Sequence, residues 1–386
     1  MYLRHHLYLV SDQITPNLTP ALDPHFRPRQ VTLLVSPEMT RQAGWIEQSL
    51  QSAGINVRRW LIEDAWDIEH LRNRVFDFVA ESDEEGLGLN VTGGTKPMSI
   101  AAYEVFRQLE KPVFYVHPER DEVVWLHPST ESSFNLADRI RLPAFFRAHG
   151  AEVMHQGNRS GVAEPLRRLT AEIVQEVDRL GRPLAALNWL AHHGREGLQS
   201  PRMERGHANW TELQQLIGRF EEHGLLSRRG DRISFPHEGA RFYVNGGWLE
   251  EHVYGEIYSL RKQAAMIHDL GRNIVVERQG GEGEVKNELD VAFLAENRLH
   301  LVECKTRTFG RRSDSKGPGS QALYKLDSLR DMLGGMQGRA MLVSYQPLSE
   351  WVRYRAKDMG IVMCEGAGLR HLKSRLEQWI GCDHKA

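Results

Sequence analysis

Three residues near the C-terminus, Asp290, Glu303 and Lys305, have the types and spacing needed to cleave a phosphodiester. Side chains two residues apart in a β-strand share a face, so Glu303 and Lys305 point the same way if their apolar segment is a strand. Asp290 begins the preceding apolar segment, and a turn at residues 296–298 would bring it beside the other two. Charges held among apolar neighbours are costly unless something compensates them.

A divalent cation would supply that compensation and the chemistry. Carboxylate oxygens suit Mg²⁺ or Mn²⁺, which activates a water and polarises the phosphoryl oxygen. The lysine would orient the water and add positive charge near the transition state. We therefore expect metal-dependent phosphodiester hydrolysis at Asp290, Glu303 and Lys305; the alternative is a surface hairpin with an ordinary Glu–Lys pair.

The elements that must position these residues alternate between helices and strands. Strands are predicted at Leu289–Ala295 and Leu299–Thr306, after a long helix at Trp248–Leu270. This pattern predicts an α/β domain over residues 246–386. Its other expected elements are a strand at Asn273–Arg278, a helix at Gln321–Leu333, a strand at Ala340–Ser344, a helix at Glu350–Met359 and a strand at Ile361–Cys364.

The two carboxylates and the lysine resemble the PD-(D/E)XK restriction-endonuclease-like superfamily. The resemblance implies that Glu250, at the start of the long helix, is a further catalytic metal ligand beside Asp290 and Glu303. It also implies that the backbone carbonyl of Cys304 binds the metal. Two alternatives stay open: Glu251 could take this role, or Glu250 could simply complement the helix dipole.

Positive charge follows the candidate core. Residues 307–321 are glycine-rich and basic, and Lys325 lies in the helix that comes next. These cations could neutralise phosphates of a substrate strand, although a solvated loop would look the same. The residues expected to contact nucleic acid are Arg307, Arg311, Arg312 and Lys325. One departure from the superfamily is Leu289, which stands where a proline usually precedes the core aspartate.

A second candidate site lies near the N-terminus, in the segment Asn90–Ser99 between a predicted strand and a predicted helix. Glycines let a backbone approach a ligand closely, and the N–H groups at a helix N-terminus favour phosphate. The segment is not a Walker A loop. We interpret it as an anion site rather than a plain strand-to-helix turn. The residues expected to bind are Thr92, Gly93, Gly94, Thr95, Lys96 and Met98.

A polar loop after the first strand should face the same crevice. Ligands of parallel sheets bind at the carboxyl ends of strands, which places Ser11, Asp12, Gln13 and Asn17 there. The elements expected within residues 1–150 are strands at Leu7–Val10, Val31–Val35, Ile55–Leu61 and Gly86–Val91, helices at Met39–Ala53, Ile68–Glu81 and Lys96–Leu109, and a hairpin of Val113–Val116 with Val123–Leu126. This alternation predicts a Rossmann-like parallel sheet with helices on both faces.

The two N-terminal loops resemble those of the CARF domain, a Rossmann-like sensor, and the string VTGGTKPMS carries most of the likeness. The domain order resembles the CARF-fused nuclease effectors of type III CRISPR immunity. That resemblance implies a homodimer that binds a cyclic oligoadenylate, specifically cyclic tetra-adenylate as the allosteric activator. It further implies cleavage of single-stranded RNA, DNA or both, including nicking.

The middle of the chain, residues 151–245, is predicted to be helical with a small hairpin. Helices are expected at Glu164–Leu180, Pro183–His192 and Trp210–Glu222, followed by strand-like pieces in Leu225–Phe235. This order is typical of a winged helix, which would dock nucleic acid, but a spacer between two larger domains fits equally well.

Composition limits the remaining possibilities. The 386 residues carry a formal net charge of −2 and three scattered cysteines, so neither a polycation nor a disulfide framework is indicated. No apolar run predicts a membrane span or a signal peptide, and a cytoplasmic location is the expectation. Two further hypotheses remain: a ligand-responsive DNA-binding transcriptional regulator with an inactive nuclease fold, or a sensor domain that degrades its own ligand through Lys96.

Overall fold

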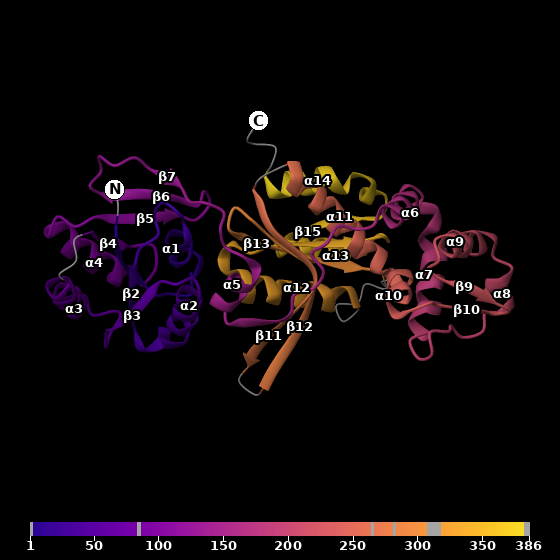
Figure 1. Cartoon of the computed structure of the whole chain (residues 1–386), viewed down its shortest axis with the longest axis horizontal. Helices are drawn as coiled ribbons and strands as arrows, with labels where there is room; N and C mark the ends of the chain where they lie inside the picture. The colour runs from indigo at the N-terminus through magenta and orange to yellow at the C-terminus, as the bar shows by residue number, and fades with distance from the viewer. Residues whose placement is uncertain (1–2, 83–85, 264–265, 281–282, 307–317, 382–386) are drawn as a thin grey trace.

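The chain folds into three lobes in a row, and their order in space differs from their order in the sequence (Figure 1). The computed structural model describes residues 3–82, 86–263, 266–280, 283–306 and 318–381. The N-terminal lobe lies at one end, residues 246–381 lie in the centre, and residues 164–245 lie at the other end. The middle of the sequence is therefore not a spacer between the two larger lobes, which pack directly against each other.

The N-terminal lobe is one sheet with helices on both faces. Its elements are β1 (His5–Leu9), η1 (Thr15–Asn17), α1 (Thr19–Leu22), β2 (Gln30–Val35), η2 (Pro37–Met39), α2 (Thr40–Ser52), β3 (Asn56–Leu61), α3 (Ile68–Glu81), β4 (Leu87–Asn90), α4 (Lys96–Gln108), β5 (Val113–His117), β6 (Glu122–His127), β7 (Phe134–Asn135) and α5 (Leu142–Ala148). The strand order is β3-β2-β1-β4-β5-β6-β7, parallel from β3 to β5 and antiparallel beyond. Helices α3 and α4 cover one face and α2 with α5 the other, which confirms the predicted Rossmann-like α/β fold.

The central lobe is a second, six-stranded sheet between helices. Its elements are β8 (Ala151–His155), α11 (Trp248–Gln263), β11 (Ile267–Gly280), β12 (Gly283–Ala295), β13 (Arg298–Lys305), α12 (Pro318–Gly334), η4 (Gly335–Gln337), β14 (Arg339–Ser344), α13 (Glu350–Asp358), β15 (Val362–Glu365), η5 (Gly366–His371) and α14 (Leu372–Ile380). The strand order is β15-β14-β13-β12-β11-β8. Helices α11 and α14 cover one face, and α12 and α13 cover the other. The predicted C-terminal α/β domain is confirmed.

Two predictions about this lobe are wrong. The helix expected at Trp248–Leu270 ends at Gln263, and β11 begins at Ile267, because residues 267–272 pair with β12 (for example Leu270 with Phe293). Residues 151–155, assigned to the middle region, form β8 and hydrogen-bond to β11 over Val275–Arg278. Tertiary pairing overrides local helix propensity in the first case. In the second case, pairing joins β8 to β11, two segments that no local sequence pattern connects.

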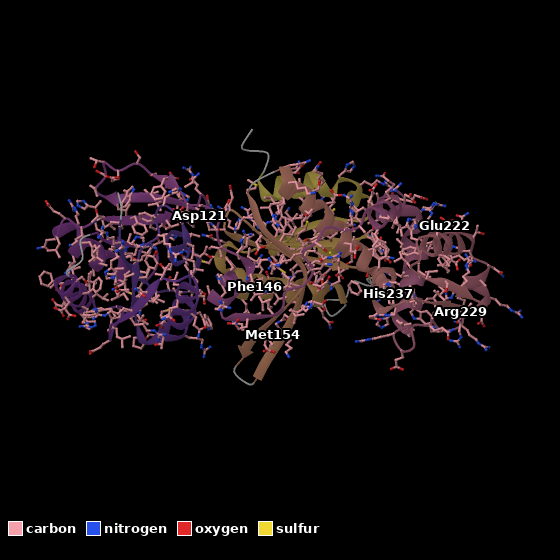
Figure 2. The ribbon with its side chains drawn as sticks, viewed as in Figure 1. Asp121, Phe146, Met154, Glu222, Arg229 and His237 are labelled. Carbon is pink, nitrogen blue, oxygen red and sulfur yellow. The ribbon has the colours of Figure 1, made fainter. Side chains whose placement is uncertain are left out.

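The third lobe contains the predicted helices and hairpin. Its elements are α6 (Glu164–Gln175), α7 (Val177–His193), α8 (Arg205–Ala208), α9 (Thr211–Glu222), β9 (Ser227–Arg229), β10 (Arg232–Ser234), α10 (Glu238–Phe242) and η3 (Tyr243–Gly247). The break between the first two helices falls at Glu176, and Pro183 lies inside α7. Figure 2 shows Glu222 and Arg229 in this lobe, at the end of the molecule away from Asp121.

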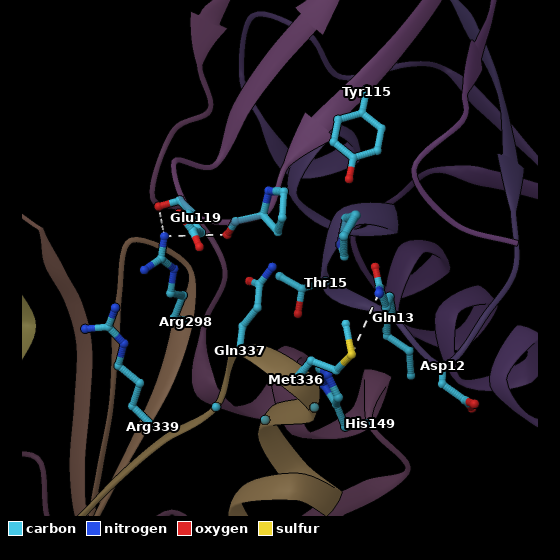
Figure 3. Close-up of a pocket in the computed structure, with 16 residues that line it drawn as sticks. Asp12, Gln13, Thr15, Tyr115, Glu119, His149, Arg298, Met336, Gln337 and Arg339 are labelled. Atoms are coloured by element: carbon cyan, nitrogen blue, oxygen red, sulfur yellow. Dashed lines mark hydrogen bonds between the residues drawn. The ribbon is translucent and has the colours of Figure 1, made fainter. Parts of the chain in front are cut away.

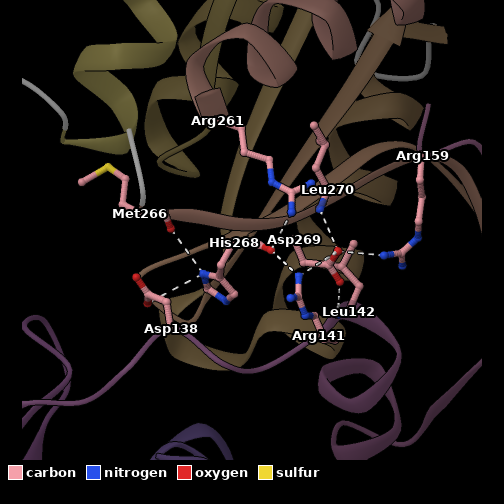
Figure 4. Close-up of polar contacts among 9 residues, drawn as sticks. All are labelled: Asp138, Arg141, Leu142, Arg159, Arg261, Met266, His268, Asp269 and Leu270. Atoms are coloured by element: carbon pink, nitrogen blue, oxygen red, sulfur yellow. Dashed lines mark hydrogen bonds and ion pairs between the residues drawn. The ribbon is translucent and has the colours of Figure 1, made fainter. Parts of the chain in front are cut away.

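Polar side chains fasten the N-terminal lobe to the central one. Asp269 of β11, 2% exposed, accepts hydrogen bonds from the Leu142 backbone N–H (2.8 Å) and from Arg159 (2.7 Å) (Figure 4). Asn297, in the turn between β12 and β13, donates to Asp121 (2.6 Å). A buried carboxylate needs such partners, so these contacts fix the angle at which the lobes meet. Among the described residues, no helix is both long and apolar enough to cross a membrane.

Candidate functional site

Asp290, Glu303 and Lys305 lie together where β12 and β13 diverge. The strands are antiparallel with Val291 opposite Val302, so Asp290 and Glu303 come next in register. The Asp290 carboxylate accepts a hydrogen bond from the Cys304 backbone N–H (2.7 Å), and Lys305 forms an ion pair with Glu303. The three side chains share the sheet face that α12 covers. The sequence had placed Asp290 at the start of its strand, but β12 begins at Gly283 and Asp290 lies within it.

Glu250 joins this group from α11. Its carboxylate accepts a hydrogen bond from Asn273 of β11 (2.7 Å), whose backbone has a φ of 53°. Glu251 instead forms an ion pair with Arg272 at 2.9 Å. Of the two glutamates, Glu250 is the one whose pKa is raised by the charge of Asp290, and this favours Glu250 over Glu251 as the residue that joins the group. Asn273 was not anticipated, since an isolated asparagine in a strand carries no pattern.

Burial makes negative charge at this site unfavourable. It raises the pKa of Asp290 to about 7, with repulsion from Glu303 adding to the effect. Burial, followed by repulsion from Asp290, raises the pKa of Glu250 to about 9. For Lys305 burial lowers the pKa, but attraction to Glu303 and Asp290 outweighs it and the net shift is upward. Three carboxylates thus lie close together, and their surplus of negative charge over the nearby lysine Lys305 and the exposed Lys325 is one that a divalent cation would neutralise.

The donor set fits Mg²⁺ or Mn²⁺, although the side chains are turned toward other partners. In the part of the chain that the structure describes, no three His, Cys, Asp or Glu side chains form a ready-made metal cluster. Glu303 is paired with Lys305, and Glu250 is bonded to Asn273. A cation would therefore compete with these contacts for the carboxylates, while the part assigned to the Cys304 carbonyl stays a prediction.

The expected nucleic-acid contacts are only partly described. Lys325 is exposed on α12, and its charge lowers the pKa of Asp290, so it faces the catalytic group. Arg307, Arg311 and Arg312 lie outside the described residues. A contact that the sequence did not suggest is made by Asn188 of α7, which donates to the Thr306 carbonyl at the end of β13 (3.1 Å). The third lobe thus borders the catalytic strand.

The N-terminal loops surround a cavity of about 820 Å³ at the carboxyl ends of β1 and β4. Five of the ten residues expected to bind ligand line it: Ser11, Asp12, Gln13, Thr92 and Gly94. The structure therefore brings the two loops together as expected.

The other predicted residues shape or flank these loops. Asn17 is fully buried and donates to the Leu9 carbonyl (3.0 Å), and Met98 is 1% exposed within the core, so neither side chain faces the cavity. Thr95 is the N-cap of α4. A Cβ on Gly93 would lie 2.1 Å from the Leu9 carbonyl oxygen, so a glycine is needed for this close approach.

Lys96 is exposed at the first position of α4 and does not line the cavity. Its place beside the helix N-terminus still suits an anion.

Comparisons with known proteins agree with this two-site arrangement. Residues 6–144 match the family model of the Card1 CARF domain, and residues 237–382 match that of the Card1-like endonuclease domain. No curated protein matches the chain. Protein VC1899 from Vibrio cholerae is 29% identical, with a TM-score of 0.89 over 98% of both chains.

Two further solved structures are similar. Can2 from Sulfobacillus thermosulfidooxidans, in complex with cyclic tetra-adenylate, is 26% identical with a TM-score of 0.81 over 97% of this chain and 99% of that one. A type III CRISPR defence DNA nuclease activated by cyclic oligoadenylate shares the fold at 19% identity, with a TM-score of 0.55 over 90% of this chain and 47% of that one. The chain therefore joins a CARF domain of the Card1 type to a Card1-like endonuclease domain.

Proposed function

We propose that this protein is a nuclease of type III CRISPR defence that cyclic tetra-adenylate activates and that uses Mg²⁺ or Mn²⁺ to cleave single-stranded RNA, DNA or both. The observation that carries the proposal is the convergence of Asp290, Glu303, Lys305 and Glu250 in a chain whose other end holds a loop-lined cavity. The likeness to Can2, whose structure contains cyclic tetra-adenylate and which this chain matches over 97% of its length, supports the choice of activator.

Each residue of the site would have its own role in catalysis. Burial raises the pKa of Asp290 to about 7 and that of Glu250 to about 9, so these carboxyls would release the protons that they hold near neutral pH when they take up a cation. Lys305 places a positive charge beside Glu303, where it can hold a water and stabilise charge on the phosphate. A bound cation supplies Lewis-acid activation of that water. Lys325, exposed on the adjoining helix, would contact the phosphate backbone.

The cavity would take up one face of the cyclic nucleotide. Ser11, Gln13 and Thr92 offer polar groups along its wall, and a second copy of the chain would cover the opposite face of the ring. We expect light scattering to give the mass of a homodimer, with or without cyclic tetra-adenylate. A monomer in both states would leave the ring half bound and contradict this part of the proposal.

One assay tests the function. The protein is incubated with single-stranded RNA or supercoiled plasmid, with Mn²⁺, in the presence and absence of cyclic tetra-adenylate. Cleavage that requires the ring supports the proposal, equal cleavage without it contradicts activation, and no cleavage in any mixture contradicts the nuclease. In the last case, ring-dependent binding of intact duplex DNA would instead support a transcriptional regulator.

Two substitutions separate the sites. Asp290→Asn should abolish cleavage and leave the affinity for cyclic tetra-adenylate unchanged. Lys96→Ala, at the N-terminus of α4, should weaken ring binding and raise the ring concentration that half-maximal cleavage requires. Loss of both properties in either variant would argue against two separate sites.

A further inference from the structure

The nuclease domain supplies one wall of the cavity that the CARF loops surround. Arg278 of β11, Asp331 and Met332 of α12, and Gly335 and Met336 of η4 line the same 820 Å³ space as Ser11 and Thr92. An adjoining cavity of about 380 Å³ is also shared between Asp12–Pro16 and Gly334–Arg339 (Figure 3). A molecule that occupies this space touches both domains of one chain.

Two arginines, one from each domain, line this cavity. Arg41 projects from α2 of the CARF domain and Arg278 from β11 of the nuclease domain, and both line the cavity. Burial, together with repulsion from Arg41, lowers the pKa of Arg278. In the described ranges neither guanidinium has a carboxylate partner, whereas Asp331 pairs with Arg330 and Asp12 accepts a hydrogen bond from Gln42. An anion between the two arginines would relieve their repulsion.

Flat and apolar surface lies beside these charges. The Arg278 guanidinium stacks over the Trp45 ring, 5.6 Å from its centroid, and Trp45 also lines the cavity. Met336 is 81% exposed at the tip of η4, and its sulfur lies 3.9 Å from the Gln13 amide nitrogen (Figure 3). Aromatic rings and thioethers are good contact surfaces for a nucleobase. Groups that suit a phosphate and groups that suit a base thus line the same cavity.

We propose that the activator is bound by both domains of the same chain: Arg41 and Arg278 hold a phosphate, and Trp45 and Met336 contact an adjacent base. This inference rests on the proposed function, because it assumes that the cavity takes a nucleotide ring. It assigns a direct part in activator binding to Arg278 and Met336, residues of the nuclease domain.

The nuclease elements that reach the cavity also reach the catalytic residues. Arg278 lies five residues after Asn273 on β11, and Asn273 holds Glu250. Met336 follows α12, which presents Lys325 toward Asp290. A ring that contacts Arg278 and Met336 would therefore touch the two elements that position the catalytic groups, and it would couple the two sites if these contacts are stronger in the active arrangement.

Binding of cyclic tetra-adenylate to the full-length protein tests the charge contact. Arg278→Met keeps most of the side-chain length and should raise the Kd at least about tenfold, because a hydrogen-bonded charge is lost. Its Kd should also depend less on salt than that of the wild type, which a purely structural defect would not produce. The matched control is Arg58→Met, since Arg58 also stacks over a tryptophan, Trp60 at 5.1 Å, but lines neither cavity. Its Kd should stay within about twofold of the wild type.

The base contact is tested in the same way. Met336→Ala should weaken binding several-fold and shift half-maximal cleavage to higher ring concentrations, while Met154→Ala, an exposed methionine on β8, should change neither. Thermal unfolding of each variant shows whether it is folded. If folded Arg278→Met and Met336→Ala both bind the ring like the wild type, the inference is overturned and the proposed function stands. If the wild type itself fails to bind the ring, both are overturned.

Discussion

The substitution Asp290→Asn should make the metal-free protein more stable while it removes cleavage. The Asp290 carboxylate is buried beside Glu303, which raises its pKa from 3.8 to about 7. Asparagine keeps an oxygen to accept the Cys304 N–H hydrogen bond but carries no charge. The charged Asp290 carboxylate, which catalysis requires, thus lowers the stability of the folded protein, as buried catalytic charges commonly do.

The size of the effect follows from the pKa. Folding raises the pKa of the Asp290 carboxyl, so between about pH 4 and pH 7 the folded state binds more protons than the unfolded state. The free energy of unfolding of the wild type therefore falls as the pH rises through that window. The difference between 3.8 and about 7 corresponds to about 4 kcal/mol at most. For a domain of this size, 1 kcal/mol moves the Tm by about 2–4 °C, so even a quarter of that value is measurable. At pH 4 the advantage of Asn over Asp should vanish, since the aspartate is protonated in the folded protein.

Thermal unfolding in EDTA at pH 4 and pH 8 measures this difference. The control is Asp358→Asn, an exposed aspartate on α13 paired with Arg355, whose loss should change the free energy of unfolding by no more than about 1 kcal/mol. Added Mn²⁺ should raise the wild-type Tm at pH 8 more than that of Asp290→Asn. The reasoning is refuted if Asp290→Asn is no more stable than the wild type at pH 8, or if its advantage is the same at both pH values.

Three further predictions follow from the same geometry. Lys305→Met leaves the buried Glu303 carboxylate without its ammonium partner, so chemical denaturation of the metal-free protein should show a free energy of unfolding lower by about 3 kcal/mol. Cleavage should also fall by about 10²-fold or more. Asn273→Ala and Asn273→Gly both remove the hydrogen-bond donor to Glu250 and should lower activated cleavage by about tenfold. Only Asn273→Ala should also lower the free energy of unfolding, by about 1–2 kcal/mol, because the backbone φ is 53°. Wild-type activity in either variant would contradict the positioning role of Asn273. Calorimetry should show Mn²⁺ affinity that rises from pH 6 to pH 8, with release of protons, since Asp290 and Glu250 have raised pKa values; an affinity independent of pH would contradict it.

The sequence predicted those features that depend on local patterns. The central strands β1, β2 and β4 of the CARF domain are short apolar runs, since both faces of a central parallel strand are buried, and this made them recognisable. Glu303 and Lys305 were found because their spacing places them on one strand face, and Asp290 because a short turn connects the two strands.

Features that depend on tertiary contacts could not be predicted. Strand β8 pairs with β11, about 120 residues later, and nothing in either segment indicates the partner. From the sequence, residues 267–270 look like the continuation of a helix, and only pairing with β12 makes them a strand. Met98 was grouped with the ligand-binding residues because the string VTGGTKPMS resembles a CARF loop, although its side chain turns into the core. Arg278 and Met336 belong to no motif, so only the shared cavity identifies them.

The strand β11 connects the three places on which regulation depends. Asp269, near its start, anchors the segment that leaves the CARF domain, Asn273 holds Glu250, and Arg278 reaches the activator cavity. Arg278 lies about 17 Å from Asn273 along an extended strand, at about 3.3 Å per residue. Pairing with β12 covers Ile274–Arg278 and resumes at Arg272, with Asn273 itself left out of the ladder, and pairing with β8 covers Val275–Arg278. The part of β11 from Val275 to Arg278 is paired on both sides, so a displacement of Arg278 also moves β8 and β12, and Asn273 lies two residues from this paired segment.

Amide hydrogen exchange can detect that response. With cyclic tetra-adenylate bound, exchange should slow in the cavity loops and also in β8 and the Asn273–Arg278 half of β11, because the ring fixes Arg278 and thereby the strand pairing around it. Helix α9, in the third lobe, contacts neither the cavity nor β11 and should keep its exchange rate. Slowing confined to the cavity loops would mean that the ring binds without engaging β11, and activation would then have to reach the catalytic residues by another route.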